Sequence, residues 1–451
     1  LDHWFLETHT SGYTAWREEL ENTSWADLVS DSGCSREQIE AAGRLIAHAK
    51  GVVAIWGNGL CQHDRGSEKV AAVCNLLMLG GHLRRRGSGL WPVRGQVNLE
   101  GSKRMGCRSE AGKDFRRALG KEFEFTLPRK RGLDVHATID ALHQGKAKVL
   151  LALGGNLLAA SPDTDGVAEA LTNCELTVSI ATHLNRFHLV PGRRSLILPC
   201  LSRTEYDRVN GSLQVSSCED SLGQVQASRG AVEPIGKEIR SESAIIAGLA
   251  LETIGAQPGF AWDRWGQNNK TLRSRITKVV PSYHDYELRL AQAGGFSATP
   301  KETLAATTEF GTEDGKAQFC LDAQPGAEPN LGGGRFLLTT LRSHGQFNSQ
   351  ILSLDDRPRG IFGERRILMM NRREMRDYGF QPGEAVEIVS EYDGVERRVS
   401  RFHCVPCEIP RGGVAAYFPE ANPLFPSIGH DAGDEAAPKS LVVTVSSSPW
   451  S

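Results

Sequence analysis

The chain of 451 residues has a formal net charge of −2 at pH 7, and 40% of its residues are hydrophobic and 24% are charged. This composition is typical of a globular protein with substantial cores, and the length indicates roughly three domains. The nearly neutral charge excludes a nucleic-acid binder of the broadly basic kind. Because no segment approaches the roughly 20 apolar residues needed to cross a bilayer, we expect no transmembrane segment.

The first third of the chain predicts alternating helices and strands. Ser35 and Gln38 form a capping-box pattern, and apolar residues at helical spacing follow them. Glycines mark the ends of two helices. The expected elements are a helix over 36–50, a short buried strand over 52–56, a polar loop over 57–63 and a helix over 68–79.

The next segment, residues 90–106, has neither a helical nor a strand period. It combines Pro92 and several glycines with Arg94, Gln96 and Asn98. A loop of this kind brings backbone close to a ligand and directs the forked donors of an arginine at it. A Pro/Gly-rich turn with an exposed arginine has the same composition, and composition alone favours that turn.

The middle of the chain repeats the alternation of strands and helices. This pattern predicts a parallel sheet, with ligand loops at the carboxyl ends of the strands. The expected elements are strands over 148–153, 176–180 and 194–198, a helix over 167–171 and a weaker helix over 242–254. A Pro/Gly-rich stretch at 325–334 indicates a linker between domains.

The last part of the chain has the pattern of a β domain. Short strands are expected over 335–340, 384–389, 396–401, 414–418 and 441–445, and Asp393-Gly394 is typical of a hairpin turn. A compact barrel closes such strands without exposed edges. We therefore expect an α/β protein with a C-terminal barrel, divided into domains at 1–106, 107–330 and 331–451.

Ten cysteines are scattered along the chain, and Cys404 and Cys407 form its CxxC motif. The scatter favours free thiols in a reducing, cytoplasmic compartment over a disulfide framework. A zinc site would need a second pair or further histidines, and His403 alone is weak support. Small core residues on a strand are the favoured interpretation.

Two Gly-rich loops are expected at strand ends, at 57–59 and 154–156. Glycines there allow backbone N–H groups to approach a phosphate, although the full dinucleotide fingerprint is absent. Two such loops favour an extended ligand that carries phosphate. His63 follows the first loop and is a candidate acid or base, while a hydrogen-bonding spacer is the commoner role for such a histidine.

Several arginines could neutralise phosphates in this nearly neutral chain. Beside Arg94 they are Arg84, Arg85, Arg86, Arg342, Arg357, Arg359, Arg365 and Arg366. The loops at 339–348 and 417–424 add amide and histidine groups suited to a nitrogen-rich heterocycle. Solvated turns and ordinary barrel loops are the alternative interpretations.

Taken in chain order, these segments resemble the alpha subunits of the molybdopterin bis-guanine-dinucleotide oxidoreductases, the dimethyl-sulfoxide-reductase superfamily. The similarity is greatest to the formate-dehydrogenase-like branch. It is carried by GNGLCQH at 57–63, PVRGQVN at 92–98, GGN at 154–156, ATHLNR at 181–186, RSHGQFN at 342–348, DRPRG at 356–360 and YFPEANP at 417–423. The resemblance implies that the C-terminal barrel is six-stranded and of the double-psi type.

The resemblance also implies a bis-molybdopterin guanine dinucleotide cofactor with molybdenum or tungsten. Arg94 would hold the carboxylate of formate for oxidation to carbon dioxide, and His63 is a second catalytic candidate. The residues implied to bind the cofactor are Gly57, Asn58, Gly59, Gln62, Gln96, Gly155, Asn156, Ser161, Thr182, Arg342, Gly345, Gln346, Phe347, Asn348, Asn422 and Lys439.

The chain departs from the family pattern at three points. Residues 81–87 read GHLRRRG where a smaller turn is usual, and Glu100 stands where glutamine is common. No cysteine lies in the context of the family's metal ligand, so no metal ligand is assigned within the chain. We expect the chain to match roughly the C-terminal three-fifths of such a subunit, with any 4Fe–4S cysteines on the preceding part.

Other functions stay open on the sequence alone. Within the superfamily, the substrate could instead be an oxyanion or an N- or S-oxide that is reduced. A non-catalytic subunit of an electron-transfer complex is an alternative from a different class. A nucleotide-binding protein without molybdenum would require one clean phosphate loop. The favoured interpretation is a small-molecule oxidoreductase with an electron-transfer partner subunit.

Overall fold

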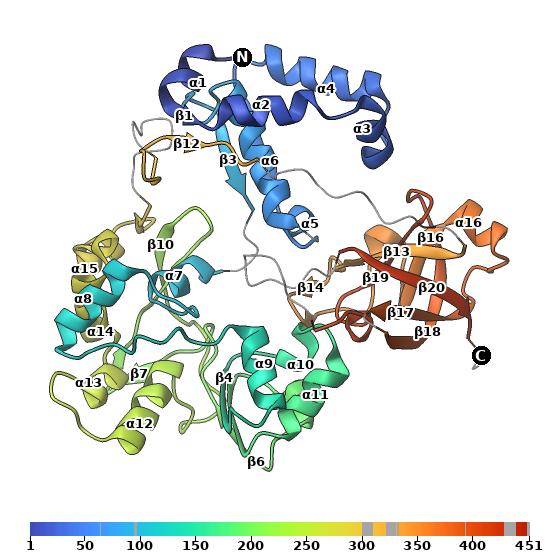
Figure 1. Cartoon of the computed structure of the whole chain (residues 1–451). Coiled ribbons are helices and arrows are strands. Elements are labelled where there is room, and N and C mark those ends of the chain that lie inside the picture. Colours follow the sequence, from blue (N-terminus) through green and yellow to red (C-terminus); the bar gives the residue numbers. More distant parts are fainter. Residues whose placement is uncertain are drawn as a thin grey trace. The chain divides into compact units, whose positions relative to one another are not determined.

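The structure is a computed structural model, and it describes residues 1–63, 65–93, 97–299, 310–321, 331, 333–392, 394–427 and 439–448. The chain divides into two compact units. Unit 1 comprises Leu1–Val93, Ala159–Asp165 and Glu302–Ser451, and unit 2 comprises Arg94–Leu158 and Gly166–Lys301. Figure 1 shows the order of the elements along the chain.

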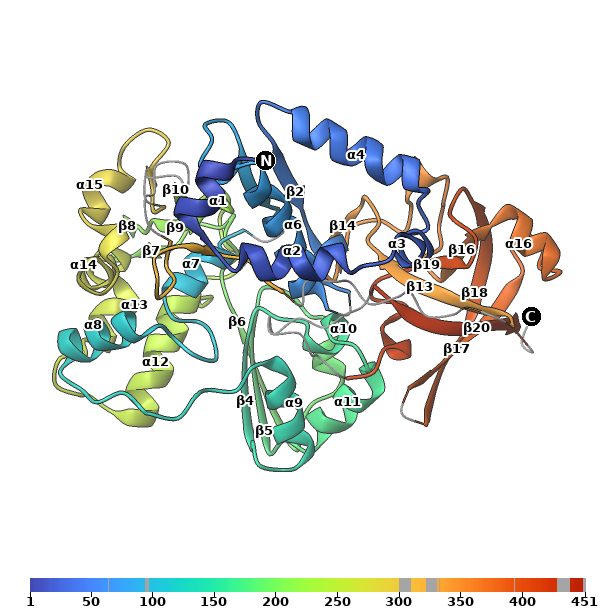
Figure 2. The ribbon, with the colours of Figure 1, turned by 45° about the horizontal axis from the view of Figure 1, so that its top comes forward.

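The N-terminal part of unit 1 is helical around a small parallel sheet. Its elements are α1 (His3–His9), β1 (Thr10–Ser11), α2 (Tyr13–Glu21), α3 (Trp25–Ser32), α4 (Arg36–His48), β2 (Val53–Trp56), α5 (Asn58–Cys61), α6 (Gly66–Leu79) and β3 (Gly89–Pro92), with β12 (Ala317–Gln318) paired to β1. Helix α6 and strand β2 lie side by side in Figure 2. Leu77 and Met78 of α6 belong to one apolar cluster with Phe5, Val52 and Ala54.

The predicted capping box is confirmed at the start of α4. The Ser35 side chain accepts from the backbone N–H of Gln38, and the Gln38 side chain accepts from the N–H of Ser35. The apolar stripe of the helix is not buried, however, and Leu45 is 76% exposed. The periodicity therefore predicted the helix correctly, while no described residue of α4 is buried.

Unit 2 contains the parallel sheet that the alternating pattern predicts. Strands β4 (Val149–Leu153), β5 (Leu176–Ala181) and β6 (Arg194–Pro199) pair in that order, all parallel. Helices α9 (Val135–His143), α10 (Leu157–Ala160) and α11 (Thr164–Thr172) accompany them. One cluster around Leu142, Leu158 and Leu171 covers one face of the sheet.

The rest of unit 2 packs helices against a three-stranded antiparallel sheet. The helices are α7 (Leu99–Arg104), α8 (Lys113–Phe123), α12 (Glu242–Ile254), α13 (Trp262–Gln267), α14 (Asn269–Val279) and α15 (Tyr286–Leu290). The strands are β9 (Ser216–Glu219), β10 (Gln224–Ser228) and β11 (Phe296–Ser297), beside a small pair formed by β7 (Arg208–Val209) and β8 (Ser212–Leu213). The core around Val225, Tyr283 and Phe296 lies in this part.

The C-terminal part is a closed six-stranded barrel, as the sequence predicts. Its strands are β13 (Arg335–Leu341), β16 (Ile367–Asn371), β17 (Ala385–Tyr392), β18 (Val395–Cys407), β19 (Gly413–Tyr417) and β20 (Leu441–Ser447), in the order β13-β19-β16-β18-β17-β20. The pair β14 (Gln346–Phe347) and β15 (Gln350–Ile351) and helix α16 (Arg372–Asp377) lie outside the barrel strands. Alternate residues such as Phe336, Leu338, Val386 and Ile388 fill the interior.

The hairpin expected around residues 393–394 and the expectation that the CxxC motif lies on a strand as small core residues are both confirmed. Strands β17 and β18 pair antiparallel up to Tyr392 and Val395, around the predicted turn. Cys404 is fully buried on β18, and burial raises the pKa of its thiol to about 12. A thiol that is buried and protonated packs as a small apolar residue.

Three sequence expectations are wrong in detail, and one strand was not expected. The strand at 52–56 is half exposed rather than buried, because Ile55 is 60% exposed. The expected loop at 57–63 contains the short helix α5, and the segment at 90–106 contains β3 and α7. Strand β16 was not predicted, although its run of buried apolar residues is typical of a central barrel strand.

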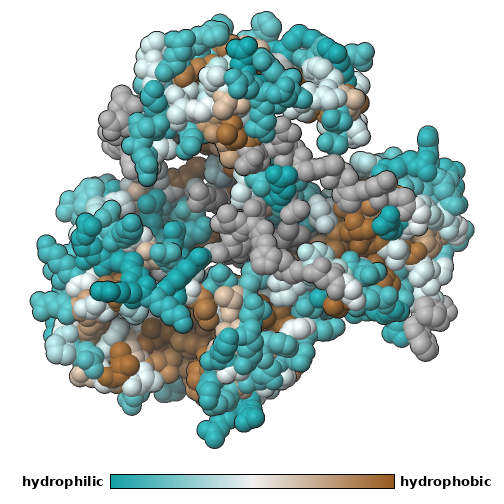
Figure 3. All heavy atoms as spheres, in the orientation of Figure 1, coloured by the Kyte–Doolittle hydropathy of each residue, from teal (hydrophilic) through white to brown (hydrophobic). Residues whose placement is uncertain are grey.

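Apolar side chains remain at the surface of the molecule. Figure 3 shows brown, apolar patches on one face. Exposed large side chains include Val149, Leu151 and Leu153, which alternate along β4. In the part of the chain that the structure describes, no helix combines the length and the apolar character needed to cross a membrane.

Candidate functional site

The first Gly-rich segment lies at the carboxyl end of β2. Gly57 precedes α5, Asn58 and Gly59 lie within it, and Gln62 follows it. A Cβ atom added at Gly59 would meet no atom within 4 Å, so packing within the described chain does not require glycine there. The bare backbone leaves room for a ligand to approach.

The predicted substrate residue cannot be placed. Arg94, together with Gly95 and Gln96, lies outside the described residues. Strand β3 ends two residues before Arg94, at Pro92, and pairs parallel with β2. Val93, the last described residue before Arg94, therefore follows β3 at the same sheet edge as Gly57.

His63 contacts the barrel within unit 1. Its Nδ1 atom lies 2.5 Å from the Ser440 hydroxyl. Ser440 directly follows Lys439, so the candidate histidine and the candidate lysine are joined through adjacent residues. The structure thus brings together two site residues that are more than 370 positions apart in sequence.

The second Gly-rich loop lies at one edge of the unit 2 sheet. Gly154 donates its N–H to the carbonyl of Ile180, which places the loops after β4 and β5 beside one another. The Gly155 carbonyl accepts from the Asn185 amide at 3.2 Å. Gly155, Asn156 and Thr182 therefore share the edge where parallel sheets bind ligands.

Thr182 also lines a polar cavity of about 360 Å³ in unit 2. Serine hydroxyls are common in its wall, together with charged residues that include Arg203, Glu205 and Asp207. Burial raises the pKa of the Asp207 carboxyl above its usual range. A cavity of this size and polarity at the end of β5 suits a hydrophilic ligand or water.

Ser161 and Asn422, predicted from distant parts of the chain, meet directly. The Asn422 side-chain amide donates to the carbonyls of Ala159 and Ser161 at 3.0 and 2.9 Å. The Asp163 N–H donates back to the Asn422 carbonyl at 3.2 Å. Because Asn422 and Ser161 are buried, these bonds fix the 159–165 segment on the barrel.

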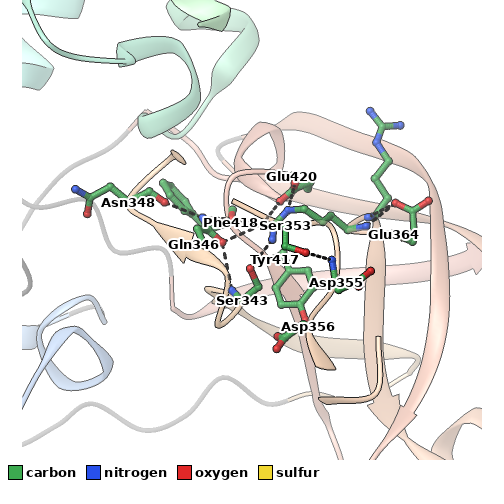
Figure 4. A network of polar contacts seen from close by, with 12 residues as sticks. Ser343, Gln346, Asn348, Ser353, Asp355, Asp356, Glu364, Tyr417, Phe418 and Glu420 are labelled. Atoms are coloured by element: carbon green, nitrogen blue, oxygen red, sulfur yellow. Dashed lines mark hydrogen bonds and ion pairs between the residues drawn. The ribbon is translucent and has the colours of Figure 1, made fainter. Parts of the chain in front are cut away.

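The loop after β13 is fixed by a buried ion pair (Figure 4). Arg365, which is 4% exposed, contacts both carboxylate oxygens of Glu420 at 2.7 and 3.0 Å. The same guanidinium donates to the Ser343 hydroxyl and to the side-chain amide oxygen of Gln346. Its fork thus bridges two loops of the barrel.

Gln346 uses its side chain inside this network. Its amide nitrogen donates to the carbonyls of Asn348 and Phe418, both at 2.8 Å. Phe347 is half exposed, and Gly345 allows close packing, because a Cβ there would lie 3.2 Å from Ser353. Gln346 therefore shapes the loop, while Phe347 remains accessible to a ligand.

Asp356 anchors the next turn of the same region. Burial by itself would raise the pKa of this carboxyl, but hydrogen bonds from Tyr417, Arg359 and His344 outweigh it and lower the pKa to about 2. The carboxylate lies 2.6 Å from the Tyr417 hydroxyl and 2.8 Å from His344 Nδ1. Sequence reasoning missed Asp356, Glu420 and Ser440 as site residues, although the first two lie in the quoted motifs.

Lys439 and Arg342 form a pair of cations in the same part of unit 1. Burial and the charge of Arg342 lower the pKa of Lys439 to about 8. The ammonium group donates to the Thr340 carbonyl and hydroxyl. Among the described residues, no carboxylate lies within ion-pair distance of either cation, so a bound anion such as a phosphate fits here.

Several of the arginines proposed for phosphate binding have other partners. Arg365 and Arg359 are paired with Glu420 and Asp356. Arg85 contacts Asp2, and Arg84 contacts His9. Arg365 and Arg359 are therefore less available to a phosphate than an unpaired arginine would be, because carboxylates already neutralise them.

A metal site was not assigned from the sequence. Within the described residues, no group of three or more histidine, cysteine, aspartate or glutamate side chains is arranged to hold a metal ion.

Comparison with known proteins shows what the chain is similar to. Residues 41–251 match the family model of the molybdopterin oxidoreductases. An uncharacterized oxidoreductase of Mycobacterium tuberculosis strain H37Rv is 36% identical over 454 residues, which cover 100% of this chain and 58% of the relative. The family match over residues 41–251 and this relative confirm the resemblance to the molybdopterin oxidoreductases that the sequence led us to expect.

Two further comparisons concern activity and fold. A Staphylococcus aureus protein named provisionally as a formate dehydrogenase is 29% identical over 290 residues, which cover 62% of this chain and 28% of that protein. Acetylene hydratase from Pelobacter acetylenicus shares the fold with a TM-score of 0.65 at 14% identity, over 99% of this chain and 68% of the hydratase. The chain thus spans about three-fifths of its mycobacterial relative, which agrees with the expected partial match.

Replacement of Asn422 tests the attachment of the 159–165 segment. In Asn422→Ala, two buried carbonyls lose their donor, at a cost of about 1–3 kcal/mol. We expect faster amide exchange at 159–165. Asn371→Ala is the control, since this barrel amide donates to Ile409 instead. Equal protection of 159–165 in both variants would contradict the attachment.

The lowered pKa of Asp356 predicts a specific pH dependence. Its carboxylate stabilises the fold by about 2 kcal/mol above its ordinary pKa of 3.8, and this contribution is lost as the pH falls from about 4 through about 2. Asp356→Asn should lose that stability at pH 7. Its free energy of unfolding, measured in urea, should also depend less on pH between pH 4 and 2 than that of the wild type.

The control is Asp377→Asn, because the exposed Asp377–Arg411 pair should contribute little. If Asp356→Asn followed the pH dependence of the wild type, Asp356 would not be the stabilising carboxylate.

Proposed function

We propose that this chain is the larger part of a molybdenum- or tungsten-dependent oxidoreductase subunit that oxidises formate to carbon dioxide. The observation that carries the proposal is the family match over 41–251 together with the cation pair Lys439 and Arg342, which has no carboxylate partner among the residues that the structure describes. The similarity to a protein named as a formate dehydrogenase supports formate as the substrate. An electron-transfer partner subunit would take up the electrons.

The barrel residues fit the anionic end of a molybdopterin guanine dinucleotide. Lys439 and Arg342 would neutralise its phosphates, and the ammonium is already held by Thr340. A bound anion would favour the charged form of Lys439 and raise its pKa from about 8. Phe347 offers an exposed ring for stacking on a heterocycle.

Each unit also has a strand-end loop with groups that a ligand could contact. In unit 1, backbone and amide groups follow the end of β2 at Gly57, Asn58, Gly59 and Gln62. In unit 2, such groups follow β4 at Gly155 and Asn156, and Thr182 follows β5. When bound, the metal–pterin group supplies a centre that accepts two electrons as formate becomes carbon dioxide and a proton.

In this proposal, Arg94 binds the substrate. A guanidinium stays charged at every physiological pH and offers two parallel donors, which match the two oxygens of a carboxylate. Formate bound in this way keeps its C–H bond on the side opposite the arginine. Arg94 would therefore orient the hydrogen without taking part in its transfer. His63, which contacts the Ser440 hydroxyl next to Lys439, would be the group that accepts the proton released in the reaction.

A charge-conserving variant tests this role. Arg94→Lys keeps the positive charge but loses the fork, so we expect formate kcat/KM to fall on the order of 10- to 100-fold, the worth of one charge-assisted hydrogen bond. Metal content should stay near that of the wild type. The full-length protein is assayed with formate and a redox dye.

Arg411→Lys serves as the control, because Arg411 is an exposed barrel residue paired with Asp377. Unchanged formate oxidation in Arg94→Lys would remove Arg94 from the substrate site. A wild-type protein that carries the metal but reduces an oxyanion or an N- or S-oxide instead would favour the reductase alternative.

A further inference from the structure

Unit 2 contains a buried carboxylate for which the proposed reaction gives no role. Glu219, the last residue of β9, is 1% exposed. Its two carboxylate oxygens have separate partners, the Arg104 Nε at 2.7 Å and the Tyr283 hydroxyl at 2.6 Å. A carboxylate in this position is costly to bury unless both oxygens are satisfied, as they are here.

The backbone of Glu219 binds the segment that follows Arg94. The Asn98 N–H donates to the Glu219 carbonyl at 3.0 Å, and the Glu219 N–H donates to the Asn98 side-chain oxygen at 3.0 Å. Asparagine before a helix usually caps that helix, but Asn98 makes no such bond to α7. Its side chain is used to hold the segment against β9.

The local backbone is built for this contact. Asn98 has a φ of 65°, in the left-handed region that asparagine tolerates better than most residues. A Cβ atom at Gly101 would lie 2.3 Å from the Asn98 side-chain oxygen and 3.3 Å from the Glu219 Cβ. Any side chain at residue 101 would therefore push α7 away from Glu219.

Both ends of α7 are thus attached to the same glutamate. Asn98 precedes the helix and Arg104 ends it. On the other side, Tyr283 lies in the core with Val225 and Phe296, and its burial and its bond to Glu219 raise the pKa of its hydroxyl. Tyr283 therefore remains a neutral donor and connects the glutamate to a rigid part of unit 2.

We infer that Glu219 is a positioning residue for the segment that carries Arg94. It acts on this segment through its bonds to Asn98 and Arg104. This inference rests on the proposed function, since it assigns Glu219 to the formate-binding role of Arg94. Asn98 stands four positions after Arg94 in the sequence, so this anchor fixes the chain shortly after the segment that carries the arginine. A fixed loop end lowers the ordering cost of substrate binding.

The test is Glu219→Gln in the purified full-length protein. The amide keeps the size of the side chain but removes the charge that holds Arg104. We expect amide exchange at 97–104 to become at least tenfold faster, with the amides of β10 unchanged. If the segment that carries Arg94 can bind formate for only a smaller fraction of the time, the KM for formate rises about tenfold while kcat stays within about twofold.

Glu122→Gln is the matched control, because Glu122 is a largely buried carboxylate of unit 2 that pairs with Arg275 and Lys278. It should change neither readout. Asn98→Gly is a second test variant, since glycine keeps the backbone angle but removes the amide, and it should reproduce the effect of Glu219→Gln.

The outcomes separate the inference from the proposed function. The positioning role would be overturned if amide exchange at 97–104 stayed unchanged in Glu219→Gln, or if exchange became equally faster throughout unit 2. It would also be overturned if exchange at 97–104 became faster while the KM for formate stayed the same. If the wild type does not oxidise formate, the proposed function fails. The exchange comparison then decides alone whether Glu219 anchors the loop.

Discussion

One buried amide, that of Asn422, connects the two kinds of structure in this chain. The segment 159–165 comes from the middle of the α/β sequence, yet it belongs to the same compact unit as the barrel. Asn422 satisfies two of its carbonyls, and the segment returns a bond to the asparagine backbone. Without this amide, two buried carbonyls would lose the hydrogen bonds that Asn422 donates, so the placement of Ser161 depends on it.

Buried charges determine which groups near the barrel remain for a ligand. Glu420 pairs with Arg365, and Asp356 pairs with Arg359 and His344, so these groups stabilise the loops. Lys439 and Arg342 have no such carboxylate among the residues that the structure describes. Burial and the charge of Arg342 disfavour the charged form of Lys439, so an anion bound beside the two cations would stabilise it. Unit 2 repeats the principle, since Glu219 is fully satisfied by Arg104 and Tyr283.

Local sequence signals predicted local structure well. The Ser35 capping box, the Asp393-Gly394 turn and the strand patterns of the barrel carry their information within a few residues. The run at 367–371 was missed as a strand, and the exposure of Ile55 was not foreseen, because burial depends on what packs from elsewhere in the chain. Site residues were predictable by type and loop position. Their partners were not, since the bonds from Asn422 to Ser161 and from His63 to Ser440 join residues hundreds of positions apart.

The central claim is that this fold holds an anionic molybdopterin dinucleotide through Lys439 and Arg342. The most direct measurement is the molybdenum, tungsten and released guanine nucleotide content of full-length protein matured in a host that makes the cofactor. We expect metal and nucleotide together in the wild type and a marked loss of both in Lys439→Met, with the barrel still folded. Matured wild-type protein that contains neither metal nor guanine nucleotide would contradict it.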